Sequence, residues 1–244
     1  MIRRSNIQSD VLVINQCDAD KTEKFAFLNK AGESCTARII HTTERGLSRS
    51  RNMAIRNATG DLCLFCDDDI ELEDQYVSSI VDAFQNYPDK SIIAFRIKYF
   101  KKECSLETKK INIFNAAKIS SVQIVFDRNK ISHEILFCEK MGSGTGNGGG
   151  EENKFLVDCI KAGHKVLYVP SLIATVNQTQ SLWFNGFDKR YWLNRGWVAK
   201  MIYGYFLGYV YIWYTIIFRA NQIDQENSWL NHISWLHKGF FESR

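Results

Sequence analysis

Three consecutive carboxylates, Asp67, Asp68 and Asp69, are the residues of this chain best suited to chemistry. They follow the apolar run 62–66, which predicts a short buried strand that ends at a polar edge. Adjacent carboxylates repel one another unless positive charge lies between them. Mg²⁺ and Mn²⁺ prefer oxygen ligands and commonly share them with substrate phosphates. The aspartates therefore predict a divalent-cation site of the D-x-D kind, which suggests nucleoside-diphosphate chemistry.

The local geometry of the aspartates leaves alternatives open. On a strand, Asp67 and Asp69 would point to one face and Asp68 to the other. A solvated turn or a helix N-cap would also explain such a cluster. A calcium EF-hand is a poor interpretation, because Leu72 stands where its loop needs Gly and Ser78 where it needs Glu.

A glycine-rich segment, 142–150, holds six of the 15 glycines. Ordering so many glycines is costly, so the segment indicates either mobility or close approach of the backbone to something else. Gly144, Gly146 and Gly149 fit G-x-G-x-x-G, which makes a dinucleotide fold an alternative. No acid for a ribose follows at the required distance and no Walker lysine follows the glycines, so the fingerprint is incomplete.

Glu151 and Glu152 open the helix predicted after the glycine segment. Helix starts stabilise negative charge, so the two residues are explained by position alone. Next to a metal site, however, one of them is a credible general base.

Alternating strand and helix patterns position these residues. Strands or extended segments are predicted at 11–15, 37–41, 62–66, 92–97, 121–126, 131–137 and 165–169, the last ended by Pro170. Helices are predicted at 46–57, 73–85 and 151–162. This alternation favours an α/β domain with a mainly parallel sheet. Ligands of such sheets bind beyond the carboxyl ends of the strands, where the aspartates lie.

Composition excludes several classes. An apolar fraction of 45% and a charged fraction of 24% are ordinary for a globular protein, and the net charge is only +4. No basic stripe with spaced aromatics occurs, so no nucleic-acid partner is predicted. Seven scattered cysteines without a signal peptide fit a reducing compartment. Cys63 and Cys66 form one isolated C-x-x-C, which is more typical of core cysteines than of zinc.

An aromatic tail follows. Residues 201–218 carry no charge, and their number is at the threshold for a spanning helix. Five tyrosines and a tryptophan favour the membrane interface instead. Helices on a membrane surface, helices packed on the domain or a partner, and a spanning helix remain open. A second apolar stripe, for which core packing is an equal alternative, consists of Trp229, Leu230, Ile233, Leu236 and Phe240.

Several segments occur in an order and spacing typical of one enzyme family. They are 46–52 (GLSRSRN), 58–61 (ATGD), 64–69 (LFCDDD), 149–152 (GGEE), 161–166 (KAGHKV) and 169–170 (VP). Over roughly residues 11–170, the chain resembles the family-2 inverting glycosyltransferases, nucleotide-sugar enzymes of the GT-A fold. The resemblance implies a Rossmann-like, mainly parallel sheet flanked by helices.

The resemblance also implies site roles. Asp69 would be the more direct ligand of Mg²⁺ or Mn²⁺, and Asp67 would lie nearer the ribose and donor sugar. Arg51 matches an arginine on the nucleotide side. Asn15 occupies a place where an acid often contacts the nucleotide, and Asp68 completes the predicted nucleotide-sugar-binding residues.

Glu152 falls at the position of the catalytic base, usually Asp in this family, and Glu151 is the fallback. The implied reaction is inverting sugar transfer from a nucleotide-sugar donor to a saccharide or lipid-linked acceptor, as in bacterial surface polysaccharide synthesis. A cytoplasmic enzyme at the inner face of the cell membrane would fit this role.

The organisation predicted from the resemblance is a GT-A domain at 1–180 and an aromatic helical tail at 181–244. Residues 1–10 are polar and 11–15 resemble the family's second strand, so its central first strand is expected to be absent. Two alternatives to a glycosyltransferase follow. One is a nucleotidyltransferase, whose basic Gly-rich N-terminal signature is lacking, and the other is a non-catalytic module that binds membrane or a partner.

Overall fold

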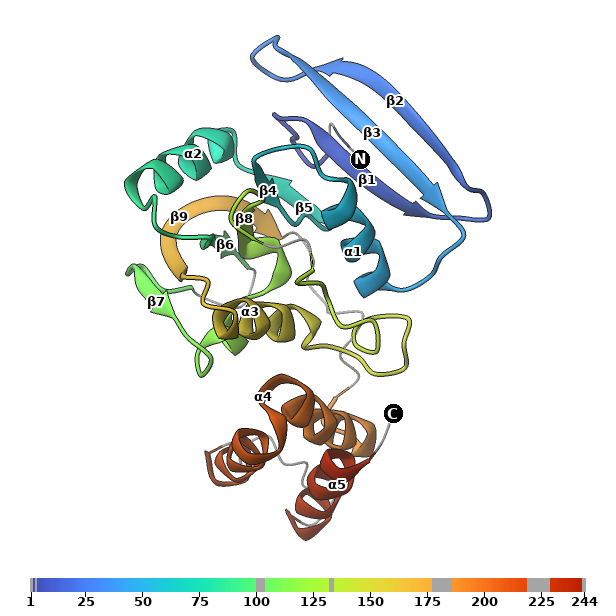
Figure 1. Cartoon of the computed structure of the whole chain (residues 1–244), viewed down its shortest axis with the longest axis vertical. Helices are drawn as coiled ribbons and strands as arrows, with labels where there is room; N and C mark the ends of the chain where they lie inside the picture. Colours follow the sequence, from blue (N-terminus) through green and yellow to red (C-terminus); the bar gives the residue numbers. More distant parts are fainter. Residues whose placement is uncertain are drawn as a thin grey trace.

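The computed structural model describes residues 2, 4–99, 104–131, 134–176, 186–218 and 229–242, and in this part the strands form two sheets (Figure 1). The three-stranded sheet has the order β1-β3-β2, formed by Val11–Gln16, Ser34–Thr42 and Lys21–Leu28. The larger sheet has the order β4-β8-β6-β9-β5, formed by Leu62–Leu64, Ile124–Asp127, Ile92–Lys98, Val166–Val176 and Ile70–Leu72. A sixth strand, β7 (Lys109–Ile111), pairs with β9.

Helices cover both faces of the larger sheet, α2 (Tyr76–Asn86) on one and α3 (Glu151–Lys161) on the other (Figure 1). Strand β6 shows why. Ile92 and Ala94 belong to the core with α3, whereas Ile93 and Phe95 belong to the core with α2. Successive residues of a strand face opposite sides, so a continuous apolar run here fills two cores.

The strand pairing is mixed. The pairs β1–β3 and β6–β9 are parallel, whereas β2–β3, β4–β8, β6–β8, β5–β9 and β7–β9 are antiparallel. The α/β sheet flanked by helices agrees with the expected GT-A class, but the expectation of mainly parallel pairing was wrong. The directions of β5, β7 and β8 depend on partner strands that are distant in the chain, which sequence patterns alone did not reveal.

Two strand ends differ from the prediction. β9 continues through Pro170 to Val176, because its register with β6 shifts there: Phe95 pairs with Val169 and Arg96 with Leu172. Proline lacks the N–H that a regular ladder needs, and the irregularity accommodates it. β4 ends at Leu64, so the aspartates lie in the turn before β5 rather than on a strand. In the described part of 131–137 there is no strand, contrary to the expected extended segment.

The two sheets do not join. Among the described residues, β1 pairs only with β3 and β4 only with β8. The N-terminal peptide instead contacts the end of β5, since the Leu72 amide donates to the Ser5 carbonyl at 3.1 Å. The absence of the family's first strand stays a prediction, and the separate sheets are consistent with it.

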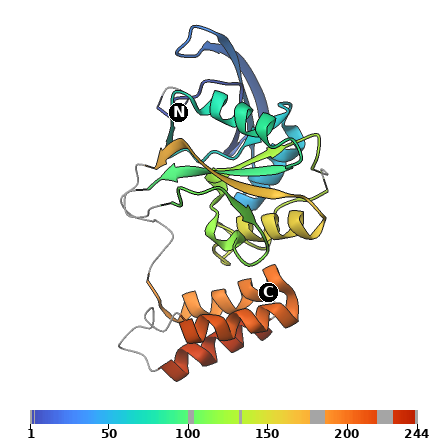
Figure 2. The ribbon, with the colours of Figure 1, turned by 90° about the vertical axis from the view of Figure 1, so that its left-hand side faces the viewer.

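A helical hairpin of α4 (Lys189–Phe218) and α5 (Trp229–Phe241) lies apart from the sheets, next to α3 (Figure 2). Gly204, with φ 78° and ψ −172°, divides α4 into two helical halves. The helices cross closely because Gly196 and Gly239 lack side chains: a Cβ on either would overlap a backbone carbonyl of the opposite helix. The half of α4 before Gly204 packs on the main body, since Trp197 and Ile202 belong to the core that contains α3.

Candidate active site

The three aspartates occupy the β4–β5 turn with alternating exposure. Asp67 and Asp69 are half-buried, while Asp68 is exposed. Burial and, second, the negative charge of Asp67 raise the pKa of Asp69 above its usual value. The pair therefore carries negative charge that its surroundings do not fully offset, which is the condition under which a bound cation stabilises two carboxylates.

Arg51 connects this turn to the start of α3. Its Nη1 lies 2.9 Å from Oε1 of Glu151, and its Nη2 lies 3.4 Å from Oδ1 of Asp67. Nη2 also donates to Oγ of Ser121 at 2.8 Å. The guanidinium is 5.4 Å from the ring centroid of Phe137. A buried arginine is retained where carboxylates and hydrogen-bond acceptors satisfy its donors, as they do here.

Helix α1 (Leu47–Asn57) brings Arg51 into this position. The next residue, Asn52, exchanges two hydrogen bonds with the backbone of Phe137, at 3.0 Å and 2.7 Å. The ring of Phe137 stacks on Phe155 with centroids 4.5 Å apart, and Phe65 meets both rings edge-on. This aromatic cluster lies beneath the Arg51 guanidinium and holds it in place, because its rings pack closely against one another.

The two glutamates at the start of α3 have different environments. Glu151 is only 5% exposed and is held by the ion pair with Arg51. Burial and, second, the negative charge of Glu151 raise the pKa of Glu152 to about 8, although Arg51 acts in the opposite direction. A carboxyl group with such a pKa can exchange a proton near neutral pH, which is what a general base requires.

The glycine segment approaches neighbouring helices closely. Gly150 has φ 84°, and a Cβ there would lie 2.8 Å from Cγ1 of Val198 on α4. At Gly142, a Cβ would lie 3.2 Å from Oγ of Ser48 and 3.3 Å from Cδ of Glu151. At Gly142 and Gly150 the close approach inferred from the sequence is thus made to the chain's own helices, whereas a Cβ on Gly146 or Gly149, with φ 80° and 82°, would meet nothing within 4 Å.

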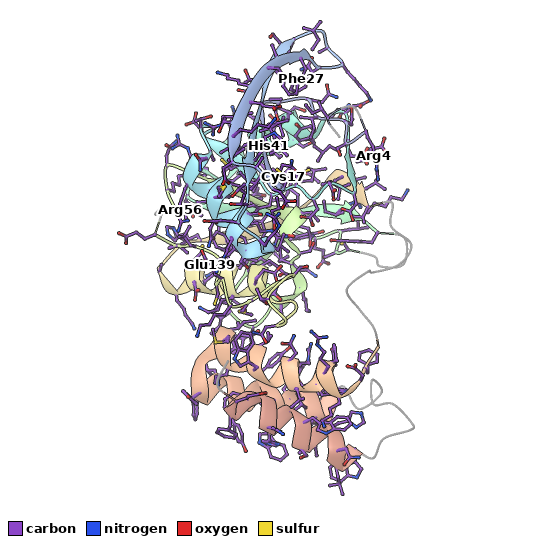
Figure 3. All side chains as sticks on the ribbon, turned by 90° about the vertical axis from the view of Figure 1, so that its right-hand side faces the viewer. Arg4, Cys17, Phe27, His41, Arg56 and Glu139 are labelled. Atoms are coloured by element: carbon purple, nitrogen blue, oxygen red, sulfur yellow. The ribbon has the colours of Figure 1, made fainter. Side chains whose placement is uncertain are left out.

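Asn15 lies apart from this network, exposed at the end of β1, with its Nδ2 2.9 Å from Nδ1 of His41. Figure 3 shows His41 and Cys17 together at this end of the strands. Gln16, the residue after Asn15, connects to α1: it donates to Oγ of Ser50 at 2.6 Å and accepts from the Gly46 amide at 2.8 Å. The structure therefore brings together Arg51 and the two groups of acids, while Asn15 contacts His41 instead.

Two site residues escaped the sequence reasoning. Ser121, in the short helix η2 (Ser121–Gln123), binds Arg51, and no sequence signal identifies it. Tyr99 follows β6. Burial is the main cause that raises the pKa of its phenol, and the negative charges of Asp67 and Glu152 raise it further. Its position at the carboxyl end of a strand was an available signal.

A cation at the aspartates would need further ligands. In the described part of the chain, no group of three or more His, Cys, Asp or Glu side chains is arranged to hold a metal ion. Two carboxylates are nevertheless a usual protein contribution to a Mg²⁺ site that is completed by substrate phosphates and water. The residues therefore fit a metal that binds together with a diphosphate.

The sequence matches the family model described as glycosyl transferase family 2 over residues 3–139, more than half of the chain. The chain belongs to glycosyl transferase family 2. It is thus a glycosyltransferase, as the resemblance implied, and sugar transfer is the reaction of this family. A comparison with curated proteins finds no significant match.

Solved structures agree on the fold of this glycosyltransferase. S. aureus TarS 1–349 is similar with a TM-score of 0.60 and 11% identity, over 96% of this chain and 72% of TarS 1–349. The same protein in complex with UDP-GlcNAc gives a TM-score of 0.55 at 11% identity, over 80% of this chain and 57% of the other. The full TarS structure is covered only to 39%. At this identity the similarity shows the GT-A fold alone.

Proposed function

We propose that this glycosyltransferase transfers a hexose, with inversion and with a divalent cation, from a nucleotide-sugar donor to an acceptor hydroxyl. The observation that carries the proposal is the Arg51 bridge, which joins Asp67 in the β4–β5 turn to Glu151 at the start of α3. A donor-side carboxylate and the start of α3, which carries the proposed base Glu152, are thereby held next to one another on rigid elements, as group transfer requires.

Asp69 and Asp67 would hold Mg²⁺ or Mn²⁺, which when bound offsets the charge of the departing nucleoside diphosphate. Arg51 orients Asp67 from the protein side. Asp68, which is exposed in the same turn, and Asn15, at the end of β1, are the proposed further contacts to the donor. S. aureus TarS has been solved with UDP and with UDP-GlcNAc, which supports a nucleotide-sugar as the class of donor.

Glu152 is the proposed base. It accepts the proton of the acceptor hydroxyl while that oxygen attacks the anomeric carbon from the face opposite the leaving group. Its raised pKa supports this role, because a base is most effective when its pKa lies near the working pH. Glu151, whose carboxylate is engaged by Arg51, is better suited to positioning than to proton transfer.

Calorimetric titration of the chain with UDP and with GDP, first with Mn²⁺ and then with EDTA, tests the donor site. We expect micromolar binding of one nucleotide with Mn²⁺ and at least tenfold weaker binding with EDTA. Asp69→Asn should abolish the metal dependence, whereas Asp82→Asn, an exposed aspartate on α2, should leave it unchanged. A folded chain that binds neither nucleotide would contradict the proposal and favour the non-catalytic module.

The helical hairpin supports a lipid-linked acceptor at an anionic membrane surface. Beyond Gly204, α4 exposes one continuous apolar face, whose members recur at helical spacing: Phe206, Val210, Trp213, Tyr214 and Ile217. The described residues of the hairpin region 186–242 include five cationic and two acidic side chains. Aromatic faces bordered by cations bind at the interface of anionic bilayers.

α4 is the one helix in the described part of the chain that is long and apolar enough to cross a membrane. The break at Gly204 leaves two shorter halves, which favours lying on the surface over spanning. In bacterial surface polysaccharide synthesis, such an enzyme would work at the cytoplasmic face of the membrane.

Cosedimentation with lipid vesicles tests this placement. The chain should bind vesicles with 30% phosphatidylglycerol. Binding should fall by about tenfold in Phe206→Ser/Trp213→Ser, since each substitution removes apolar surface that the bilayer would otherwise bury. Phe114→Ser is the matched control, because Phe114 is 72% exposed but lies on the main body. Equal binding by all three proteins, or none, would contradict membrane association through α4.

A further inference from the structure

A cysteine, a histidine and a glutamate meet at one end of the three-stranded sheet, outside the Arg51 network. Sγ of Cys17, the residue that follows β1, lies 3.5 Å from Nδ1 of His41 on β3 (Figure 3). Nε2 of the same ring lies 3.6 Å from Oε1 of Glu23 on β2. A thiol next to a base that a third group orients is the arrangement of an activated nucleophile.

Strand pairing gathers the polar side chains around this imidazole. Lys21 of β2 pairs with His41 of β3, and Glu23 follows Lys21 by two residues. Asn15 of β1 pairs with His41 from the other side. Paired residues share a face of a sheet, and so do residues two apart on one strand. The ladder therefore places an amide, an ammonium group and a carboxylate around one histidine ring.

The imidazole is placed to take the proton of the Cys17 thiol. In the described part of the chain, the thiol has one other acceptor, the Ala19 carbonyl at 3.6 Å, which accepts a hydrogen bond but does not remove the proton. Nδ2 of Asn15 lies 2.9 Å from the same Nδ1 of His41. An amide group offers both a donor and an acceptor, so Asn15 can hydrogen-bond to this nitrogen before and after it gains a proton.

The charges around the ring suit this transfer. Nε2 of His41 is buried and makes no hydrogen bond among the described residues, so the charge of a protonated ring would face Glu23. The hydrogen bond and charge of Lys21, and then the charge of His41, lower the pKa of Glu23 and keep it a carboxylate. Glu23 is the main cause that raises the pKa of Lys21, and the charge of an ionised Cys17 adds to it. The ammonium group is thus close enough to stabilise a thiolate.

The acids beside Cys17 have partners of their own. Asp18 forms an ion pair with Arg45, and Asp20 accepts hydrogen bonds from the amide and the hydroxyl of Thr43. Their negative charges are therefore partly offset, and they oppose a thiolate at Cys17 less than free carboxylates would.

The other cysteines lack this setting. Burial raises the pKa of four thiols, which keeps them protonated at neutral pH: Cys35, Cys63, Cys66 and Cys159. Sγ of Cys104 donates to the Ile97 carbonyl at 3.4 Å, and Cys138 packs against the core that contains α3. Within the ranges that the structure describes, Cys17 is the one cysteine whose sulfur faces a histidine.

We propose that Cys17 is a modification site that forms a mixed disulfide with a low-molecular-weight disulfide, with His41 as the base. His41 takes the thiol proton, and the thiolate of Cys17 attacks one sulfur of the disulfide. A new S–S bond forms, the original S–S bond breaks, and the other half leaves as a thiolate that takes the proton back from His41. Cys17 is thereby oxidised, and half of the disulfide is reduced to a thiol.

Access and independence both favour this assignment. Cys17 is only partly buried, so a small disulfide can reach its sulfur. Cys17, His41 and Glu23 are not among the residues proposed to bind the donor or to accept the acceptor's proton. The inference therefore stands or fails separately from the proposed sugar transfer.

Incubation of the folded chain with oxidised glutathione at neutral pH, followed by peptide mass mapping over time, tests the inference. We expect Cys17 to react faster than Cys104 or Cys138 by about tenfold or more. His41→Gln should lower the Cys17 rate by about tenfold, since solvent alone then removes the proton. His237→Gln, which changes a half-buried histidine of α5, is the matched control and should leave the rate unchanged.

Glu23→Gln, at an exposed position, serves if His41→Gln does not fold, and it should lower the rate by about threefold. In concentrated guanidinium chloride, wild type and His41→Gln should react alike, because the acceleration depends on the folded geometry. A Cys17 that reacts no faster than Cys104 would overturn the inference. Equal Cys17 rates in the folded wild type, His41→Gln and Glu23→Gln would overturn it as well.

Discussion

At the scale of single residues, Glu152 is the group whose protonation matters most. Its folded pKa of about 8 lies above the 4.5 of an ordinary glutamate, so the folded chain holds a proton that the unfolded chain releases. The contribution of this proton to folding stability is therefore fully present below about pH 4.5 and is lost as the pH rises toward 8. Activity should change in the opposite direction, because only the ionised carboxylate can accept the acceptor's proton.

The variant Glu152→Gln checks both effects. Thermal melts from pH 5 to 9 should show the variant gaining stability relative to wild type by roughly 2 to 4 kcal/mol as the pH rises, since glutamine does not ionise. Sugar transfer should fall by about 100-fold or more, while Mn²⁺-dependent UDP binding persists. The exposed Glu44→Gln is the control. A pH-independent stability difference would argue against a raised pKa.

Sequence reasoning proposed the charged members of the candidate site because their types and order carry information along the chain, and their roles stay predictions. Arg51, Asp67, Glu151 and Glu152 come from three distant segments, and their contacts match a shared site. It could not identify Ser121, since a serine that binds a buried guanidinium has the same local sequence as any surface serine.

At the scale of elements, apolar runs predicted the strands that are buried on both faces, whereas exposed strands were not predicted. Strand β2 is almost wholly exposed and carries three charged residues, so neither burial nor alternation marks it. It exists because all eight residues pair with β3. The continuation of β9 past Pro170 likewise depends on its partner, β6, and not on local preference.

The α4–α5 crossing supplies a prediction at this scale. Gly196→Ala should destabilise the chain by about 1 to 3 kcal/mol, because the new Cβ overlaps the Leu236 carbonyl. In an exposed helix the same change would stabilise by about 1 kcal/mol. Gly148→Ala, where a Cβ meets nothing within 4 Å, is the control in chemical denaturation. A stabilised Gly196→Ala variant would show that the helices do not cross at this contact.

At the scale of the whole molecule, the division into two sheets was anticipated only indirectly, through the expected absence of a strand that the family has. The tail was harder, since whether an aromatic helix packs inward or faces outward depends on surfaces that sequence periodicity does not reveal. α5 illustrates this: Leu236 and Phe240 are buried against α4, while Trp229 and Leu230, in the same apolar stripe, are exposed.

The separation of the two sheets has a consequence for the local unfolding of the protein. No backbone ladder joins β1 to β4 in the described part of the chain, so packing and side-chain hydrogen bonds, among them those from Gln16 to α1 and from Arg38 to the Asn57 carbonyl, hold the small sheet in place. Such contacts couple two units less tightly than a shared ladder does, and each unit can then open on its own. The amides of β1–β3 should accordingly exchange with solvent through partial openings, while those of β6 and β9 exchange only when the whole protein unfolds.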